Sequence, residues 1–208
     1  QINSPFKGLP KEVSVLTTIS FLVAVGFGLI IPAIPIFAKT FGVSNTLIGL
    51  IVSSFAIMRF VSGLFSGKLV DRFGERVVLG FGLFMVSVFT LLAGLAQSYE
   101  QLLFFRTAGG LGSSMFSVSA GALILRVVSD SQRGRAQSLY NGGFIAGGVA
   151  GPAFGGALIA ISPRAPFFIY SGLLIAAGTV SLIYLHESRL GEKIEVAKEE
   201  REINCPIG

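Results

Sequence analysis

Six long runs of apolar residues dominate the sequence, and each is long enough to cross a lipid bilayer, which takes about 20 helical residues. Four runs contain no charged residue, and the second and fourth contain one each, Arg59 and Arg106. Lipid offers no water to unpaired backbone groups, and the runs lack the alternating polarity of barrel strands, so they must be helices. The sequence therefore predicts an all-α membrane protein with a six-transmembrane-helix bundle. The expected spans are residues 13–38, 45–66, 77–99, 101–125, 136–163 and 165–185.

The composition supports a membrane protein and argues against a soluble one. Only 13% of the 208 residues are charged and 52% are hydrophobic, whereas soluble domains carry about 25% charged residues. The net charge of +5 does not indicate a nucleic-acid partner, because the basic residues lie in short connections between apolar runs. The single cysteine, Cys205, excludes an internal disulfide. We expect no enzyme activity, no cofactor and no metal site.

Lysine and arginine in the connections predict the orientation, because cytoplasmic loops are enriched in them. One side of the predicted membrane holds only Lys39 and Arg164, and no basic residue lies in the connection between the third and fourth runs. We therefore expect both termini in the cytoplasm, and an integral protein of the inner or plasma membrane without a cleaved signal peptide. The twelve basic residues expected on the cytoplasmic side are Lys7, Lys11, Lys68, Arg72, Arg76, Arg126, Arg133, Arg135, Arg189, Lys193, Lys198 and Arg201.

The two ends of the chain are expected to leave the membrane. Residues 1–12 form a cytoplasmic segment. Residues 186–208 mix acidic and basic side chains with few apolar ones, which is typical of a solvated helix or linker. This stretch is either a charged cytoplasmic tail or the start of a linker to a further bundle.

Four glycine-containing motifs occupy defined places on the predicted helices. They are GFGLIIPAIP at 26–35, GKLVDRFGER at 67–76, RTAGGLG at 106–112 and GGVAGPAFGG at 147–156. The second falls in a charged segment, 67–79, which we expect to be a short turn on the cytoplasmic side. Each motif alone is weak evidence, since glycine is common in membrane helices, but their order and sidedness together are informative.

Together these motifs resemble those of the major facilitator superfamily, and the fourth is similar to the signature of its twelve-helix drug:proton antiporter branch. The resemblance covers the N-terminal six helices of such a transporter, a bundle built as a 3+3 inverted repeat. It implies a second six-helix half, in the same or a separate chain, and a small-molecule substrate bound between the halves. It also implies efflux of drugs or lipophilic compounds by alternating access, with coupling to protons as an open alternative. The motif residues concerned are Gly28, Pro32 and Pro35; Gly67, Asp71, Arg72, Gly74 and Arg76; Arg106, Gly110 and Gly112; and Gly147, Gly151, Pro152, Gly155 and Gly156.

The fifth run carries a stripe of glycines at every fourth position, Gly143, Gly147, Gly151 and Gly155. Small residues at this spacing let a second helix approach closely. Ordinary packing is one interpretation. The resemblance implies a further role, in which the stripe seals the interface between bundles against leakage.

Two arginines lie inside predicted spans. Arg106 lies about six residues from the outer end of its run, roughly 9 Å deep, and Arg59 about 12 Å from the inner end. An intramembrane arginine is costly, so we expect each to face a cavity or a partner, with snorkelling to the headgroups as the alternative. The resemblance assigns Arg106 to proton coupling or to a polar network in the cavity. No acidic residue lies within the runs, so this half offers no carboxylate for a proton site.

Asp71 is expected at the cytoplasmic end of the second helix, where the helix dipole disfavours a negative charge. Arg72 or Arg76 offers a local partner. In the resembled family, this aspartate instead contacts a helix of the second half and latches one conformation.

The substrate-lining residues are the least determined part of the sequence. The abundance of phenylalanine and the lack of buried acids favour an apolar cavity that suits neutral or anionic lipophiles. Each candidate is also compatible with a place in the core or against lipid. The candidates are Phe27, Phe55, Met115, Asn141 and Phe144.

Two other functions remain open at this point. The chain could be an autonomous six-helix channel or a homodimeric half-transporter. A remote alternative is a rhomboid-like intramembrane serine protease with Ser113 and His186, although Ser113 is not in a G-x-S-G motif and His186 follows the last run.

Overall fold

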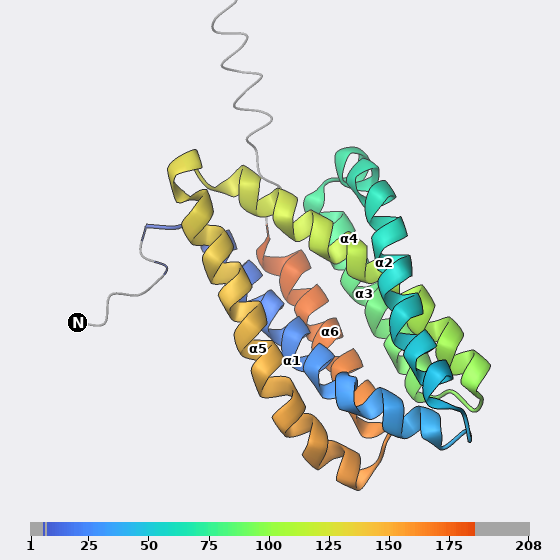
Figure 1. Ribbon diagram of the computed structural model, residues 1–208. Coiled ribbons are helices and arrows are strands. Elements are labelled where there is room, and N and C mark those ends of the chain that lie inside the picture. Colours follow the sequence, from blue (N-terminus) through green and yellow to red (C-terminus); the bar gives the residue numbers. More distant parts are fainter. Residues whose placement is uncertain (1–5, 7, 186–208) are drawn as a thin grey trace, which may run out of the picture.

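The computed structural model describes residues 6 and 8–185, and within them it confirms the expected bundle of six long helices (Figure 1). A short 3-10 helix, η1 (Asp130–Gln132), precedes the fifth of them. The predicted segment 186–208 and His186 lie outside the described residues. The long helices are α1 (Lys11–Lys39), α2 (Asn45–Phe73), α3 (Glu75–Gly94), α4 (Tyr99–Val127), α5 (Arg133–Ile161) and α6 (Ala165–Tyr184).

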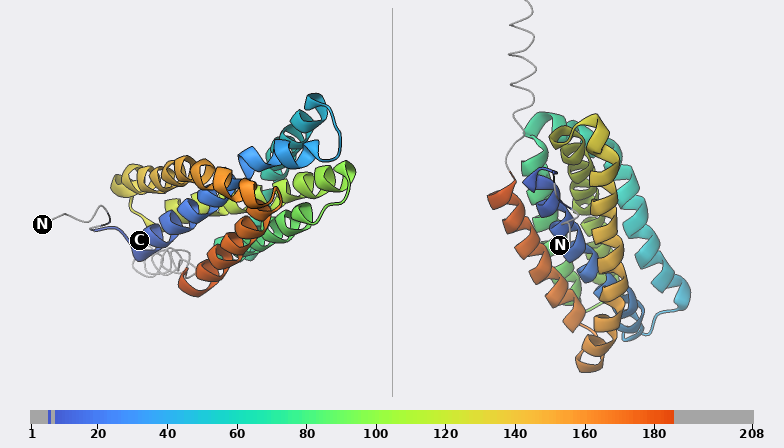
Figure 2. Two further views of the ribbon diagram at one scale, coloured as in Figure 1. Left: turned by 90° about the horizontal axis from the view of Figure 1, so that it is seen from below. Right: turned by 90° about the vertical axis from the view of Figure 1, so that its left-hand side faces the viewer.

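The helices form two groups of three. α1 packs against α5 and α6, and α4 packs against α2 and α3, while α3 against α6 joins the groups (Figures 1 and 2). If α1, α2 and α3 are exchanged with α4, α5 and α6, the α1–α5 contact becomes the α4–α2 contact. In the same way, α1–α6 becomes α4–α3, and α3–α6 maps onto itself. This packing pattern is that of a repeat of three helices.

The chain reverses at alternate ends of the bundle. The α2–α3 and α4–α5 connections lie at one end, and the other three connections lie at the opposite end (Figure 1). The first end is the one at which the sequence predicts the cytoplasm.

The expected turn at 67–79 is wrong in its extent, because α2 continues through most of it to Phe73. The charged side chains in the added helical turns, Lys68, Asp71 and Arg72, are exposed beyond the apolar run, so they do not oppose a further two turns of helix. Gly74 alone separates α2 from α3. Its φ of 82° lies in the region that favours glycine, and its N–H still donates to the carbonyl of Val70.

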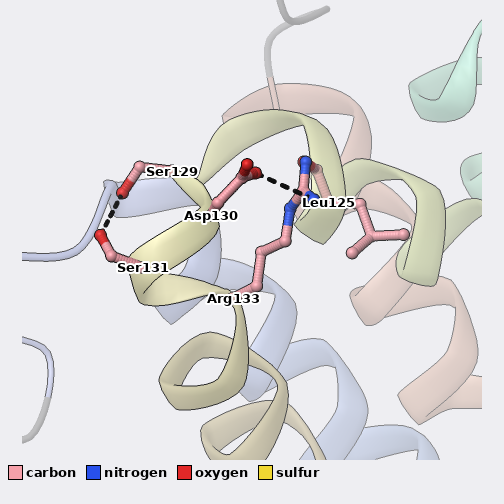
Figure 3. Close-up of polar contacts among 5 residues, drawn as sticks. All are labelled: Leu125, Ser129, Asp130, Ser131 and Arg133. Atoms are coloured by element: carbon pink, nitrogen blue, oxygen red, sulfur yellow. Dashed lines mark hydrogen bonds and ion pairs between the residues drawn. The ribbon is translucent and has the colours of Figure 1, made fainter.

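Local polar contacts close the α4–α5 connection. Asp130 forms an ion pair with Arg133 at 2.9 Å, and Arg133 also donates to the carbonyl oxygen of Leu125 at 3.4 Å (Figure 3). The hydroxyls of Ser129 and Ser131 lie 3.2 Å apart. These contacts start α5 at Arg133, ahead of the predicted span 136–163.

Candidate functional site

The α1–α5 interface is a contact between two backbones. A Cβ added to any glycine of the stripe would lie 2.5–2.9 Å from an α1 carbonyl oxygen, closer than real Cβ contacts allow. The carbonyls recur every four residues, as the glycines do, so the two helices run parallel and in register. The facing pairs are Gly143 with Thr17, Gly147 with Phe21, Gly151 with Val25 and Gly155 with Leu29.

The first and fourth motifs meet within this interface. A Cβ on Gly28 would lie 2.9 Å from both the Cα of Gly151 and the Cδ of Pro152. A Cβ on Gly155 would lie 3.3 Å from the Cγ of Pro32. Gly156, in contrast, has open space at its Cβ position. Most of the fourth motif is therefore used in packing against α1, and Gly156 is free of that constraint.

The third motif packs on two sides of α4. A Cβ on Gly110 would lie 2.7 Å from the carbonyl oxygen of Phe55 in α2, and one on Gly112 would lie 2.5 Å from that of Gly82 in α3. These glycines bring α4 against both neighbours and place its polar side chains beside α2.

Arg106 is buried between α4 and α2, with only 4% of its surface exposed. Its guanidinium lies over the ring of Phe55, 4.4 Å from the centroid. Its Nε is buried without a hydrogen-bond partner among the described residues. This burial favours a place in the bundle interior over snorkelling to the headgroups. The Phe55 ring supplies a cation–π contact in place of a carboxylate.

Arg59 is held differently, by a hydrogen bond to α4. Its Nη2 donates to the Ser117 hydroxyl at 2.8 Å, and that hydroxyl donates to the carbonyl of Ser113 at 2.9 Å. The Arg59 side chain is otherwise exposed and lines a groove of ≈ 470 Å³ between α2 and α4. The remaining lining residues of this groove are Ala56, Phe60, Gly63, Leu64, Ser114, Ser117 and Val118.

A small central pocket joins Arg59 to the other group of helices. It is lined by Phe27 of α1 and Phe144 of α5, and Phe27 also packs on Phe55 with ring centroids 6.1 Å apart. Three of the five candidate lining residues thus come together around the arginines. Tyr170 of α6 lines the same pocket, although it is not among the residues expected from the sequence. Its position in the middle of an apolar run was the one sequence feature that could have indicated it.

The other two candidates lie elsewhere. Met115 packs with Val70 and Val78 on the α3 side of α4. It is nine positions from Arg106, which at 3.6 residues per turn is the opposite face of the helix. Asn141 is exposed on α5 and accepts a hydrogen bond from Gln137 at 3.1 Å.

The second motif lies at the end of the bundle where the sequence predicts the cytoplasm, and it makes few contacts with the described residues. Arg72 lies over the Phe73 ring, and Arg76 donates to the carbonyl oxygen of Leu182 in α6. Asp71 is exposed and makes no ion pair with any described residue. A Cβ on Gly67 would meet nothing.

A neighbouring ion pair ties α3 to α4. The Glu75 carboxylate is buried, and Arg126 contacts it at 2.8 Å. Because Glu75 follows Gly74 directly, this pair anchors the start of α3 beside the exposed Asp71.

Among the described residues, no cluster of three or more histidine, cysteine, aspartate or glutamate side chains has the arrangement of a metal site.

Ser113 lines the central pocket beside Ser117.

The six membrane-length helices and their small-residue interfaces define the class of protein as a helical-bundle membrane protein. Residues 16–205 match the sequence profile of the Major Facilitator Superfamily, so the chain belongs to that family.

Two curated relatives are named for drug resistance. The chain is 30% identical over 183 residues to the Quinolone resistance protein NorA of Staphylococcus aureus strain MRSA252, covering 86% of this chain and 46% of NorA. It is 29% identical over 185 residues to Multidrug resistance protein 2 of Bacillus subtilis strain 168, covering 88% of this chain and 46% of that protein. The chain therefore spans about half the length of these relatives.

A solved structure shares the fold. A bacterial homolog of the human lysosomal transporter Spinster, inward-facing and unoccupied, superposes with a TM-score of 0.77 at 22% identity. The match covers 89% of this chain and 44% of the Spinster homolog.

Proposed function

We propose that this chain forms the N-terminal half of a transporter that exports drugs or other small lipophilic molecules. The two halves rock against each other around a central site, which is thereby exposed to each side of the membrane in turn. The curated relatives named for quinolone and multidrug resistance support the substrate class.

The exposure of α2 and α5 is the observation that supports a second half. In the most apolar stretches of α2 and α5 only 17% of residues are buried, against 56% in α1 and α4. These two helices flank the central pocket, to which α2 contributes Arg59 and α5 contributes Phe144. A second six-helix bundle, in the same or a separate chain, covers this side and completes the substrate cavity.

For proton coupling, we propose that the titrating group comes from the second half and that Arg106 supplies a fixed positive charge. Every described acidic residue lies in a connection or in the first or last turn of a helix, where water reaches it, with Glu75 the buried exception. The arginine is at the centre and the acids are at the ends.

Transport by separated halves tests the function. Inside-out vesicles containing this chain and its C-terminal half are expected to accumulate a quinolone when a pH gradient is imposed. Vesicles with either half alone are expected to accumulate none. Accumulation by this chain alone would show instead that it works as a homodimer or a channel.

The orientation has a separate test, because Cys205 is the single cysteine of the sequence. We propose that both termini are cytoplasmic in the inner or plasma membrane. A membrane-impermeant maleimide is then expected to label Cys205 in inside-out vesicles and not in intact cells. Labelling of Cys205 in intact cells would show that the C-terminal end lies outside the cell, which contradicts the proposed orientation.

A further inference from the structure

Arg59 is a charged residue in a membrane helix, and most of its hydrogen-bond donors are unused. A guanidinium has five N–H donors. Among the described residues Arg59 makes one hydrogen bond, to the neutral Ser117. A positive charge at this depth is costly unless an anion or a polar cavity receives it, and no carboxylate in the described part of the chain forms an ion pair with Arg59.

The contacts around Arg59 fix the direction of the guanidinium. The Ser117 hydroxyl gives its proton to the Ser113 carbonyl, so its oxygen is free to accept from Arg59. One edge of the guanidinium is thus attached to α4. The groove between α2 and α4 lies beside this side chain, so its remaining donors are available to a molecule in the groove.

The groove has the shape and lining of a site for a lipophilic ligand. Its ≈ 470 Å³ is within the range of about 300–1,000 Å³ found for small-molecule sites. Apart from Arg59, Ser114 and Ser117, its lining is apolar, with Phe60 and Leu64 as the largest side chains. One cation surrounded by apolar surface suits a molecule with one anionic group on an apolar body.

The positive charge around the groove is not confined to Arg59. Arg106 lies over the ring of Phe55, which packs on Phe27, and Phe27 and Arg59 line the same central pocket. Apart from Arg59, the residues that line the central pocket carry no charge; they are Val23, Phe27, Ser113, Phe116, Ser117, Phe144 and Tyr170. A lipophilic cation entering from this half would meet two positive charges and no compensating acid.

We propose that Arg59, positioned by Ser117, forms a carboxylate-binding subsite, and that the compounds moved by this transporter are lipophilic anions. The carboxylate accepts two parallel N–H bonds from the Arg59 guanidinium, the geometry that arginine favours. The apolar body lies against Phe60 and Leu64. This inference rests on the proposed function and specifies its substrate.

Binding to the transporter assembled from both halves tests the subsite. The probes are radiolabelled 2-naphthoate, a lipophilic anion, and tetraphenylphosphonium, a lipophilic cation. The wild type is expected to prefer naphthoate. Arg59→Gln is expected to weaken naphthoate binding at least about tenfold, the loss typical of a hydrogen-bonded charge, and Arg59→Lys less. Lys68→Gln is the matched control, because it removes an exposed cation from the same helix, and it is expected to leave affinity within about twofold.

Charge reversal keeps the test decisive if a neutral variant folds poorly. Arg59→Glu is expected to lose naphthoate binding and to gain binding of tetraphenylphosphonium. Naphthoate affinity that is equal in the wild type and Arg59→Gln, or a wild type that binds only the cation, would overturn the subsite. Vesicle transport separates the two proposals, because transport of the cation without the anion overturns the subsite and leaves export standing. If neither probe is transported, the proposed export function is overturned.

Discussion

Arg106 and Arg164 show how position changes the meaning of the same contact. Both guanidinium groups lie over phenylalanine rings, Arg106 over Phe55 at 4.4 Å and Arg164 over Phe37 at 5.1 Å. Arg164 lies in the α5–α6 connection and also donates to the carbonyl of Ala96 at 3.1 Å, so it closes one end of the bundle. Arg106 is buried beside the central pocket, where packing alone does not require a charged side chain.

The Arg106→Ala variant is expected to reduce transport by the assembled protein at least about tenfold, and Arg106→Lys, which keeps the charge, less. A cation–π contact worth about 0.5–2 kcal/mol would be lost together with the charge of the cavity. The measurement is vesicle uptake across a series of pH gradients, in which Arg106→Ala is expected to flatten the pH dependence. Arg164→Ala serves as the control, since it removes a similar contact at the membrane surface. Unchanged transport and pH dependence in Arg106→Ala would exclude the coupling role.

At the scale of the helix, the sequence predicts which segments span the membrane better than where each helix ends. The apolar run indicates where the helix enters the lipid. The helix can continue past that point, because charged side chains that are exposed to water are compatible with helical backbone. α2 therefore extends from the predicted residue 66 to Phe73. α3 instead ends at Gly94, short of the predicted 99, because Leu95–Ser98 form the connection to α4.

Helix faces are less predictable than helix positions, because an apolar run in lipid has little amphipathic pattern to orient it. The glycine stripe is the exception, since its spacing alone places Gly147 and Gly151 on one face, and both meet α1. Met115 and Tyr170 show the limit. Without knowledge of the neighbouring helices, nothing in the run distinguishes a side chain that faces α3 from one that faces the central pocket.

Two glycines of the same motif give opposite expectations for stability. Gly151→Ala would place a Cβ 2.5 Å from the Val25 carbonyl oxygen, so α1 and α5 must separate, at a cost of about 1–3 kcal/mol for overpacking. Gly156→Ala meets nothing and gains up to about 1 kcal/mol of helix propensity. Thermal denaturation in detergent, followed by size-exclusion chromatography, should show a lower midpoint for Gly151→Ala only. Equal midpoints would mean that the interface is looser than its geometry indicates.

For the whole molecule, the pseudo-symmetric packing explains why α1 and α4 are buried while α2 and α5 are open. Each inner helix is held by one helix of the other repeat on either side: α1 by α5 and α6, and α4 by α2 and α3. α2 and α5 each have one main partner, so a large part of their surface remains for a second half or for lipid. The α1–α5 backbone contact makes one side of the bundle stiff. Movement is therefore more easily accommodated between halves than within this one.

Asp71 connects this bundle to such a movement. It lies in the last turn of α2, at the unfavourable end of the helix dipole, and neither nearby arginine pairs with it, since Arg72 contacts Phe73 and Arg76 contacts Leu182. A charge left unpaired in this half is well placed to bind a group of the second half. We therefore expect that Asp71 stabilises the state in which the cytoplasmic ends of the two halves are together.

In the assembled transporter, Asp71→Asn is expected to shift the balance toward the inward-open state. Single cysteines introduced on the two sides of the cavity should then react with maleimide about tenfold faster on the cytoplasmic side, corresponding to the loss of about 1.4 kcal/mol of differential stabilisation. Asp130→Asn is the matched control, because Asp130 is an exposed acid at the same end that already pairs with Arg133. Identical labelling of the wild type and Asp71→Asn would show that the closed cytoplasmic side is held by other contacts, of which the Glu75–Arg126 pair is the nearest.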